Sequence, residues 1–82
     1  MNELSTLPVG AVELDRHSSD IPRSVRRLAS GEMGPFYLKY RRSHYAVSAL
    51  NAYSNYIQES GVADKVDVYR AGRTVIFSKR WI

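Results

Sequence analysis

The sequence contains no cysteine and only two histidines among its 82 residues. Without cysteine there is no disulfide framework and no thiolate ligand for zinc or iron. The two histidines, His17 and His44, and the carboxylates do not show a spacing that is typical of metal ligands. The sequence therefore predicts no metal ion and no cofactor.

Long hydrophobic runs are also absent. Uninterrupted aliphatic or aromatic runs such as FYL and VIF reach three residues, whereas a membrane-spanning helix needs about 20. The first ten residues include Glu3 and show no basic region followed by an apolar stretch, so they do not resemble a secretory signal. We expect no membrane association and a cytoplasmic location.

Acidic residues are fewer than basic ones. Eight Asp and Glu stand against twelve Lys and Arg, which gives a formal charge of +4 and an isoelectric point near 9.7. Nine of the twelve basic residues are arginine, whose planar guanidinium group suits phosphate and carboxylate. The charge favours nucleic acid or an acidic protein surface as partner. A chain of this length predicts a single domain, residues 1–82, without a large internal cavity.

Caps and periodicity predict two helices. Ser19 or Asp20 can cap a first helix that has Pro22 in its first turn and ends at Gly31. Ser43 is the expected N-cap of a longer helix that ends at Gly61. The apolar stripe of the longer helix should face the core; it consists of Ala46, Ala49, Leu50, Tyr53, Tyr56 and Ile57.

Alternating residues predict the strands. We expect a short strand in residues 9–15, a second in residues 34–42, and a hairpin in residues 65–81 that turns at Ala71 and Gly72. With that turn, Val68 would face Val75 and the core side of the hairpin would carry valines and a phenylalanine. The fold class is then α+β, in the order βαβαββ, with a single-layer sheet of three to four strands covered on one side by two helices. The other side of the sheet is expected to face solvent.

That exposed side would gather aromatic and basic residues. Aromatic rings there can stack on the bases of single-stranded nucleic acid while the cations contact phosphates. An ordinary solvated strand surface is the alternative interpretation, and Asp67 and Ile76 on the same side favour it. The residues concerned are Tyr37, Lys39, Arg41, Lys65, Tyr69 and Arg80.

The first helix should add a second basic surface. Its outer side carries Arg23, Arg26 and Arg27, and the basic cluster also includes Arg16 before the helix and Arg41 and Arg42 after the next strand. The cluster could bind phosphate or simply form an ordinary charged helix surface.

Catalysis has little support in the sequence. The stretch HSSD, residues 17–20, holds the residue types of a catalytic triad, but a triad is defined by geometry between separate segments. We interpret it as a loop ending in a cap and expect no enzyme activity and no catalytic residue.

The preferred hypothesis is a small basic domain that binds nucleic acid, single-stranded by preference, without catalysis. The alternative is a protein–protein interaction through the same Tyr and Arg side chains, as in an inhibitor or adaptor, for example a phage inhibitor of a host protein or of the anti-CRISPR type. An unpaired strand edge could also join two copies into a homodimer.

Overall fold

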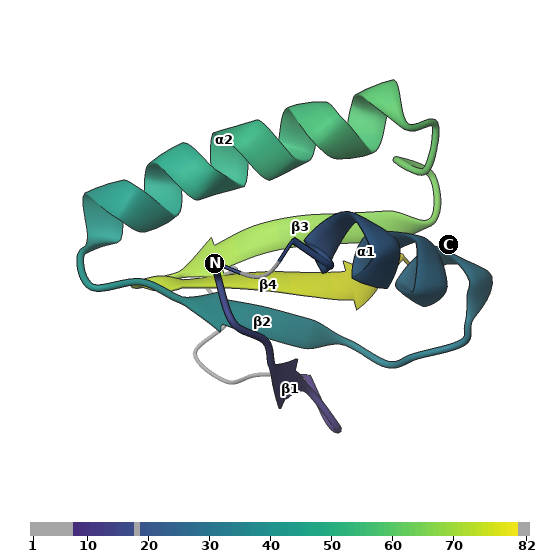
Figure 1. The fold of residues 1–82 in the computed structure, drawn as a ribbon, viewed down its shortest axis with the longest axis horizontal. Coiled ribbons are helices and arrows are strands. Elements are labelled where there is room, and N and C mark those ends of the chain that lie inside the picture. Colours follow the sequence, from purple (N-terminus) through teal and green to yellow (C-terminus); the bar gives the residue numbers. More distant parts are fainter. Residues whose placement is uncertain (1–7, 18, 81–82) are drawn as a thin grey trace.

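The computed structural model describes residues 8–17 and 19–80, which form one four-stranded sheet and two helices (Figure 1). In chain order the elements are β1 (Val12–Glu13), α1 (Ile21–Ser30), β2 (Phe36–Lys39), α2 (Ser43–Glu59), β3 (Val66–Ala71) and β4 (Thr74–Lys79). The order βαβαββ and the α+β class are those predicted from the sequence. No helix within the described ranges is long and apolar enough to cross a bilayer.

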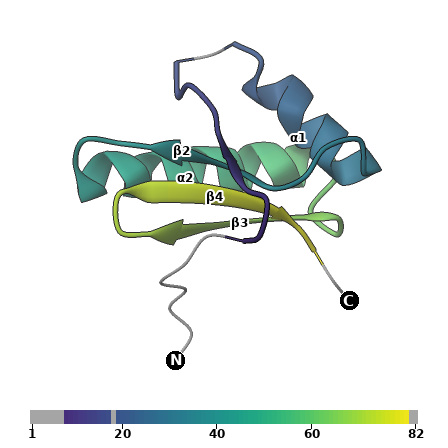
Figure 2. The same cartoon turned by 90° about the horizontal axis from the view of Figure 1, so that it is seen from below.

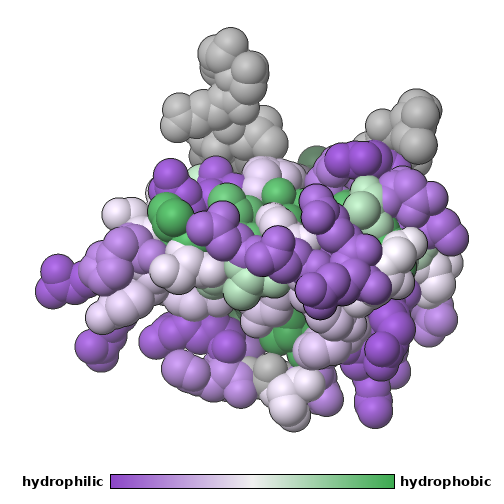
Figure 3. Space-filling model, turned by 90° about the horizontal axis from the view of Figure 1, so that it is seen from above, coloured by the Kyte–Doolittle hydropathy of each residue, from purple (hydrophilic) through white to green (hydrophobic). Residues whose placement is uncertain are grey.

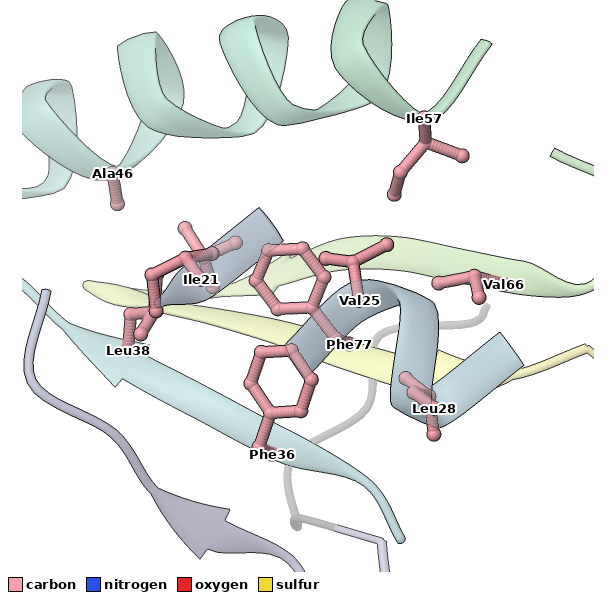
Figure 4. Packing of buried hydrophobic residues seen from close by; sticks show 10 residues of the cluster. Ile21, Val25, Leu28, Phe36, Leu38, Ala46, Ile57, Val66 and Phe77 are labelled. Carbon is pink, nitrogen blue, oxygen red and sulfur yellow. The ribbon is translucent and has the colours of Figure 1, made fainter. Parts of the chain in front are cut away.

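The strands lie in the order β1-β2-β4-β3. β1 runs parallel to β2, and β4 runs antiparallel to both of its neighbours, so the sheet is mixed. Buried residues of both helices belong to one hydrophobic cluster with those of β2 and β4, so both helices cover the same side of the sheet (Figure 4). This agrees with the predicted single layer.

The helix α1 begins and ends where its sequence indicates. Asp20 occupies the N-cap position, and Gly31 ends the helix with φ 87°. At this left-handed geometry the Gly31 N–H donates to the carbonyl of Leu28, at 3.2 Å, which is the usual role of glycine at a helix C-terminus. Ile21, Val25 and Leu28 form the buried face of the helix.

The helix α2 has a different N-cap from the one predicted. Arg42 is the extended N-cap residue, with φ −135° and ψ 152°, and Ser43 is already helical. The prediction of Ser43 as N-cap is therefore wrong, because the Arg42 carbonyl is the one that accepts the N–H of Ala46. Five of the six residues of the predicted apolar stripe face the core: Ala46 and Ile57 are buried, and Ala49, Tyr53 and Tyr56 pack against the cluster. Leu50 is half-buried and does not belong to the cluster.

Aromatic rings form the centre of the core. Phe36 and Phe77 are direct partners across β2 and β4, and their rings stack with centroids 4.6 Å apart. Tyr53 of α2 meets Phe77 edge to face at 5.2 Å. Both phenylalanines are fully buried. Because aromatic pairs add to the free energy of area burial, this cluster couples the sheet to α2.

The hairpin turn differs from the prediction by one position. The turn residues are Gly72 and Arg73, and Val68 pairs with Phe77 instead of Val75. Gly72 has φ 64°, and hairpin turns that need positive φ at their first central residue select glycine there. Since the register moves by two residues, each side chain stays on its predicted side of the sheet.

The first strand is shorter than predicted. Of residues 9–15, only Val12 and Glu13 pair with β2. Val9 and Gly10 lie in a turn, in which Gly10 has φ 81°. Figure 2 shows the segment around β1 crossing in front of β2 and β4, with α2 behind the sheet.

The side of the sheet opposite the helices is not fully open. Ile76 lies on this side between its two cross-strand partners, Tyr37 and Tyr69, and its exposed fraction is 0%. Both tyrosines are half-buried. The prediction that this side faces solvent is therefore wrong at Ile76, which forms a second, smaller buried site.

We expect Ile76→Ala to lower the free energy of unfolding by about 2–5 kcal/mol, because it would leave a cavity at a fully buried position between Tyr37 and Tyr69. Urea denaturation followed by circular dichroism measures this change. Val47→Ala is the control, since Val47 is 39% exposed and its loss should change stability by no more than about 0.5 kcal/mol. Equal, small effects of both substitutions would show that Ile76 is not sealed from solvent.

Candidate functional site

Tyr37 and Tyr69 lie in one row across the sheet. They occupy β2 and β3 and are separated by Ile76 of β4. Two strand spacings put their Cα atoms about 10 Å apart. Burial, followed by the charge of Asp67, raises the pKa of Tyr69 above its usual value. The two rings therefore share a side as predicted, but each is partly covered by its surroundings.

The predicted cations of the sheet separate into two groups. Lys39 is opposite Thr74 beside the hairpin turn, and Arg41 follows in the loop, because β2 ends at Lys39 and does not continue through Arg42. Lys65 and Arg80 lie at the other end of β3 and β4, where the Arg80 N–H donates to the Lys65 carbonyl. The length of β3 separates the two groups by about 20 Å.

Arg80 already has an acidic partner. Its Nε and Nη2 both lie 2.8 Å from Oδ1 of Asp67. Since this pairing compensates part of its charge, Arg80 offers less attraction to a phosphate than an arginine without a carboxylate.

The three arginines of α1 lie apart from the tyrosines. Arg23, Arg26 and Arg27 lie on the outer side of α1 or at its edge, while α1 packs its buried face on the helix side of the sheet. The structure thus does not bring all nine predicted site residues onto one surface.

Six cations gather at the end of the molecule that holds the hairpin turn. In Figure 1 this is the left end, where β2 ends, α2 begins and β3 turns into β4. We call this group the arginine-rich end; it consists of Arg16, Lys39, Arg41, Arg42, Arg70 and Arg73.

Three of these arginines are held by main-chain carbonyls. Nη1 of Arg16 donates to the carbonyl of Lys39 at 3.1 Å, and Nη1 of Arg73 donates to that of Arg41 at 3.2 Å. Arg70 donates to the carbonyl of Gly72 at 2.8 Å. A carbonyl oxygen has no net charge, so these bonds orient the guanidinium groups without neutralising them, and each guanidinium has five N–H donors in total.

A surface hollow of about 350 Å³ opens within the arginine-rich end. We call it the Arg16 hollow. Its lining consists of Arg16, His17, Tyr40, Arg41 and Tyr45. The guanidinium carbon of Arg16 lies 5.9 Å from the centroid of the Tyr40 ring, within the range of a cation–π contact. The hollow therefore combines aromatic walls with cationic groups.

Most residues of the hollow were not predicted as site residues from the sequence. Alternation assigned Tyr40 to the apolar side of its strand, and Tyr45 lies in the first turn of a helix, where it is 51% exposed. Arg16 is 23 residues from Lys39, whose carbonyl it contacts. The one available signal was the basic composition around residues 16 and 41–42.

The segment HSSD leads into α1, whose N-cap residue is Asp20. Its Ser18 lies outside the described residues. The main-chain N–H of His17 donates to Oδ1 of Asp15 at 2.9 Å, which is a local turn. Within residues 8–17 and 19–80, no group of three or more His, Asp or Glu side chains is placed to hold a metal ion.

No family model, no curated protein and no solved structure gives a significant match to this chain. The support for the candidate site is therefore the geometry of this structure alone.

Burial raises the pKa of the Tyr40 phenol, the charge of Tyr53 adds to this, and Arg16 opposes it. Because the folded protein favours the protonated phenol, the stability that it contributes is complete below pH 10 and is lost as the pH rises through the raised value. We expect Tyr40→Phe to lose less stability than the wild type as the pH is raised above about 10, as measured by urea midpoints. Tyr45→Phe, at the exposed wall of the hollow, is the control. Parallel losses in the wild type and in Tyr40→Phe would contradict the expectation.

Proposed function

We propose that this protein binds single-stranded nucleic acid without catalysing a reaction, and that the arginine-rich end is its main phosphate-binding surface. The observation that carries the proposal is the set of Arg16, Arg70 and Arg73, whose guanidinium groups are fixed by bonds to neutral carbonyls. Fixed cations with spare donors are suited to the regularly spaced phosphates of a strand.

The positions of these cations suit an extended ligand. They come from the segment before α1, the end of β2, the start of α2 and the hairpin, which are distant in sequence but adjacent in the fold. The main-chain N–H of Tyr40 donates to the carbonyl of Arg73 at 2.9 Å and so holds two of these segments together. A flexible strand can follow such a surface by neutralising one phosphate after another, with release of the bound counterions.

Tyr37 and Lys39 connect this surface to the sheet. They are on the same side of β2, with Lys39 next to the hairpin turn and Tyr37 one row further along. The strand would leave the arginine-rich end past Lys39 and place bases against Tyr37 and Tyr69. Base stacking on aromatic side chains contributes about 1–3 kcal/mol per base and needs unpaired bases, which is why we propose a single strand.

The face that carries α2 offers less support for a hydrophobic partner. Figure 3 shows this face as largely hydrophilic, with hydrophobic side chains in separate patches. Stable protein interfaces have an apolar centre surrounded by polar residues. A polyanionic ligand at the arginine-rich end therefore fits the surface better than a protein on this face.

The test is a fluorescence-anisotropy titration of a labelled twelve-nucleotide single strand at several salt concentrations. We expect the logarithm of the association constant to fall linearly with the logarithm of the salt concentration. The slope of this line should decrease in magnitude by about 0.7 for each phosphate that the protein no longer neutralises. The double variant Arg42→Gln, Arg73→Gln should show this decrease. The matched control, Arg23→Gln with Arg26→Gln, removes the same charge from α1 and should keep the wild-type slope.

Two results would contradict the proposal in different ways. Equal effects of the two double variants would show that overall charge, and not the arginine-rich end, governs binding. Absence of binding to any strand, together with tight and salt-insensitive binding to one acidic protein, would favour the inhibitor or adaptor hypothesis.

A further inference from the structure

The Arg16 hollow has a size and composition that the binding of an extended strand does not require. Its volume of about 350 Å³ lies at the lower end of the range for small-molecule sites. Phosphates along a strand need only exposed cations, whereas this hollow also has two tyrosine walls. A ligand of the hollow should therefore match both the cations and the aromatic walls.

The aromatic walls match a planar ring. Tyr40 is half-buried and Tyr45 is 51% exposed, so one wall is deep and the other lies at the mouth. The Tyr45 ring also contacts the His44 ring, with centroids 4.2 Å apart. Because the Arg16 guanidinium lies over the Tyr40 ring, the exposed Tyr45 ring is the wall on which a nucleobase can stack. Any of the bases can do so, since every base has a π-face.

The cationic groups match a phosphate. Arg16 and Arg41 line the hollow together with His17, and none of the five lining residues is acidic. The Arg16 guanidinium is held by the Lys39 carbonyl and lies over the Tyr40 ring, so its position is defined on two sides. Arginine binds phosphate oxygens in pairs of parallel hydrogen bonds, which lysine does not do.

We propose that the Arg16 hollow binds a nucleotide that ends in a phosphate monoester, with the base stacked on Tyr45 and the phosphate on Arg16 and Arg41. The inference rests on the proposed function and specifies its ligand. An internal phosphate is a diester with one negative charge, whereas a monoester carries about 1.5 to 2 at pH 7. Two arginines at one site therefore discriminate in favour of the monoester, which is found at the end of a strand or on a free nucleotide.

The experiment compares three ten-nucleotide single strands of one sequence that carry a phosphate at the 5′ end, at the 3′ end, or at neither. Each is labelled through an internal base, and binding is measured by fluorescence anisotropy at physiological salt. We expect one of the phosphorylated strands to bind about tenfold more tightly than the unphosphorylated strand, as for one additional charge-assisted contact. Free AMP is added as a competitor, and displacement at a concentration similar to that of the strand identifies the free nucleotide as the ligand.

Variants assign the effect to the hollow. Arg16→Gln should abolish the preference for the phosphorylated strand, and Arg16→Lys should restore it only in part because it lacks the planar fork. Arg26→Gln, which makes the same charge change on α1, should retain the preference. Because Arg16 also bonds to Lys39, thermal unfolding checks each variant, and Tyr45→Ala at the exposed wall gives a second test that does not break this bond.

The outcomes separate this inference from the proposed function. Equal, salt-sensitive affinity for all three strands would overturn the monoester site and leave nucleic-acid binding in place. A preference that persists in Arg16→Gln and in Tyr45→Ala would also overturn it. Binding of AMP that Arg16→Gln abolishes, without binding of any strand, would support the hollow and overturn the strand-binding function.

Discussion

The pairing of Phe36 with Phe77 fixes the arrangement on which the rest of the molecule depends. The two rings stack at 4.6 Å beneath Tyr53 of α2, and slipping β2 by one residue would turn Phe36 and Leu38 out of the core. The same register puts Lys39 opposite Thr74. The hydrophobic core thereby determines which charged residues meet at the hairpin end, so the candidate site follows from packing several residues away.

Local signals in the sequence were sufficient to predict the helices and strands, but they did not predict the contacts between them. Pro22 and Gly31 enclose α1 because each acts through its own backbone geometry. The hairpin register required more, because Gly72 can occupy either the first or the second central position of a two-residue turn, and the choice shifts the register by two residues. Ile76 was predicted to lie at the surface because alternation assigns sides and does not show what covers them. The Arg16 hollow could not be predicted, because it depends on a contact across 23 residues.

Arginine has two roles in this fold, which composition alone does not separate. Arg80 pairs with Asp67 and joins the ends of β3 and β4. Arg16 and Arg73 instead bond to carbonyls of the chain that leads into α2. Both kinds of contact hold the structure together, but only the second leaves the positive charge uncompensated by its partner. Net charge is therefore a weaker guide to binding than the identity of each acceptor.

The connection between β2 and α2 is restrained from several directions. The carbonyls of Lys39 and Arg41 accept bonds from two arginine side chains, the Tyr40 N–H donates to the Arg73 carbonyl, and the Arg42 carbonyl accepts the N–H of Ala46. Ordering a mobile loop and its long side chains on association usually costs about 0.5–1.5 kcal/mol for each side chain immobilised. The bonds to Arg16 and Arg73 reduce this loss for those two side chains, because they already restrict the guanidinium groups in the folded protein. The proposed ligand would therefore meet guanidinium groups that are already oriented, and rigidity at this end of the molecule would contribute to its affinity.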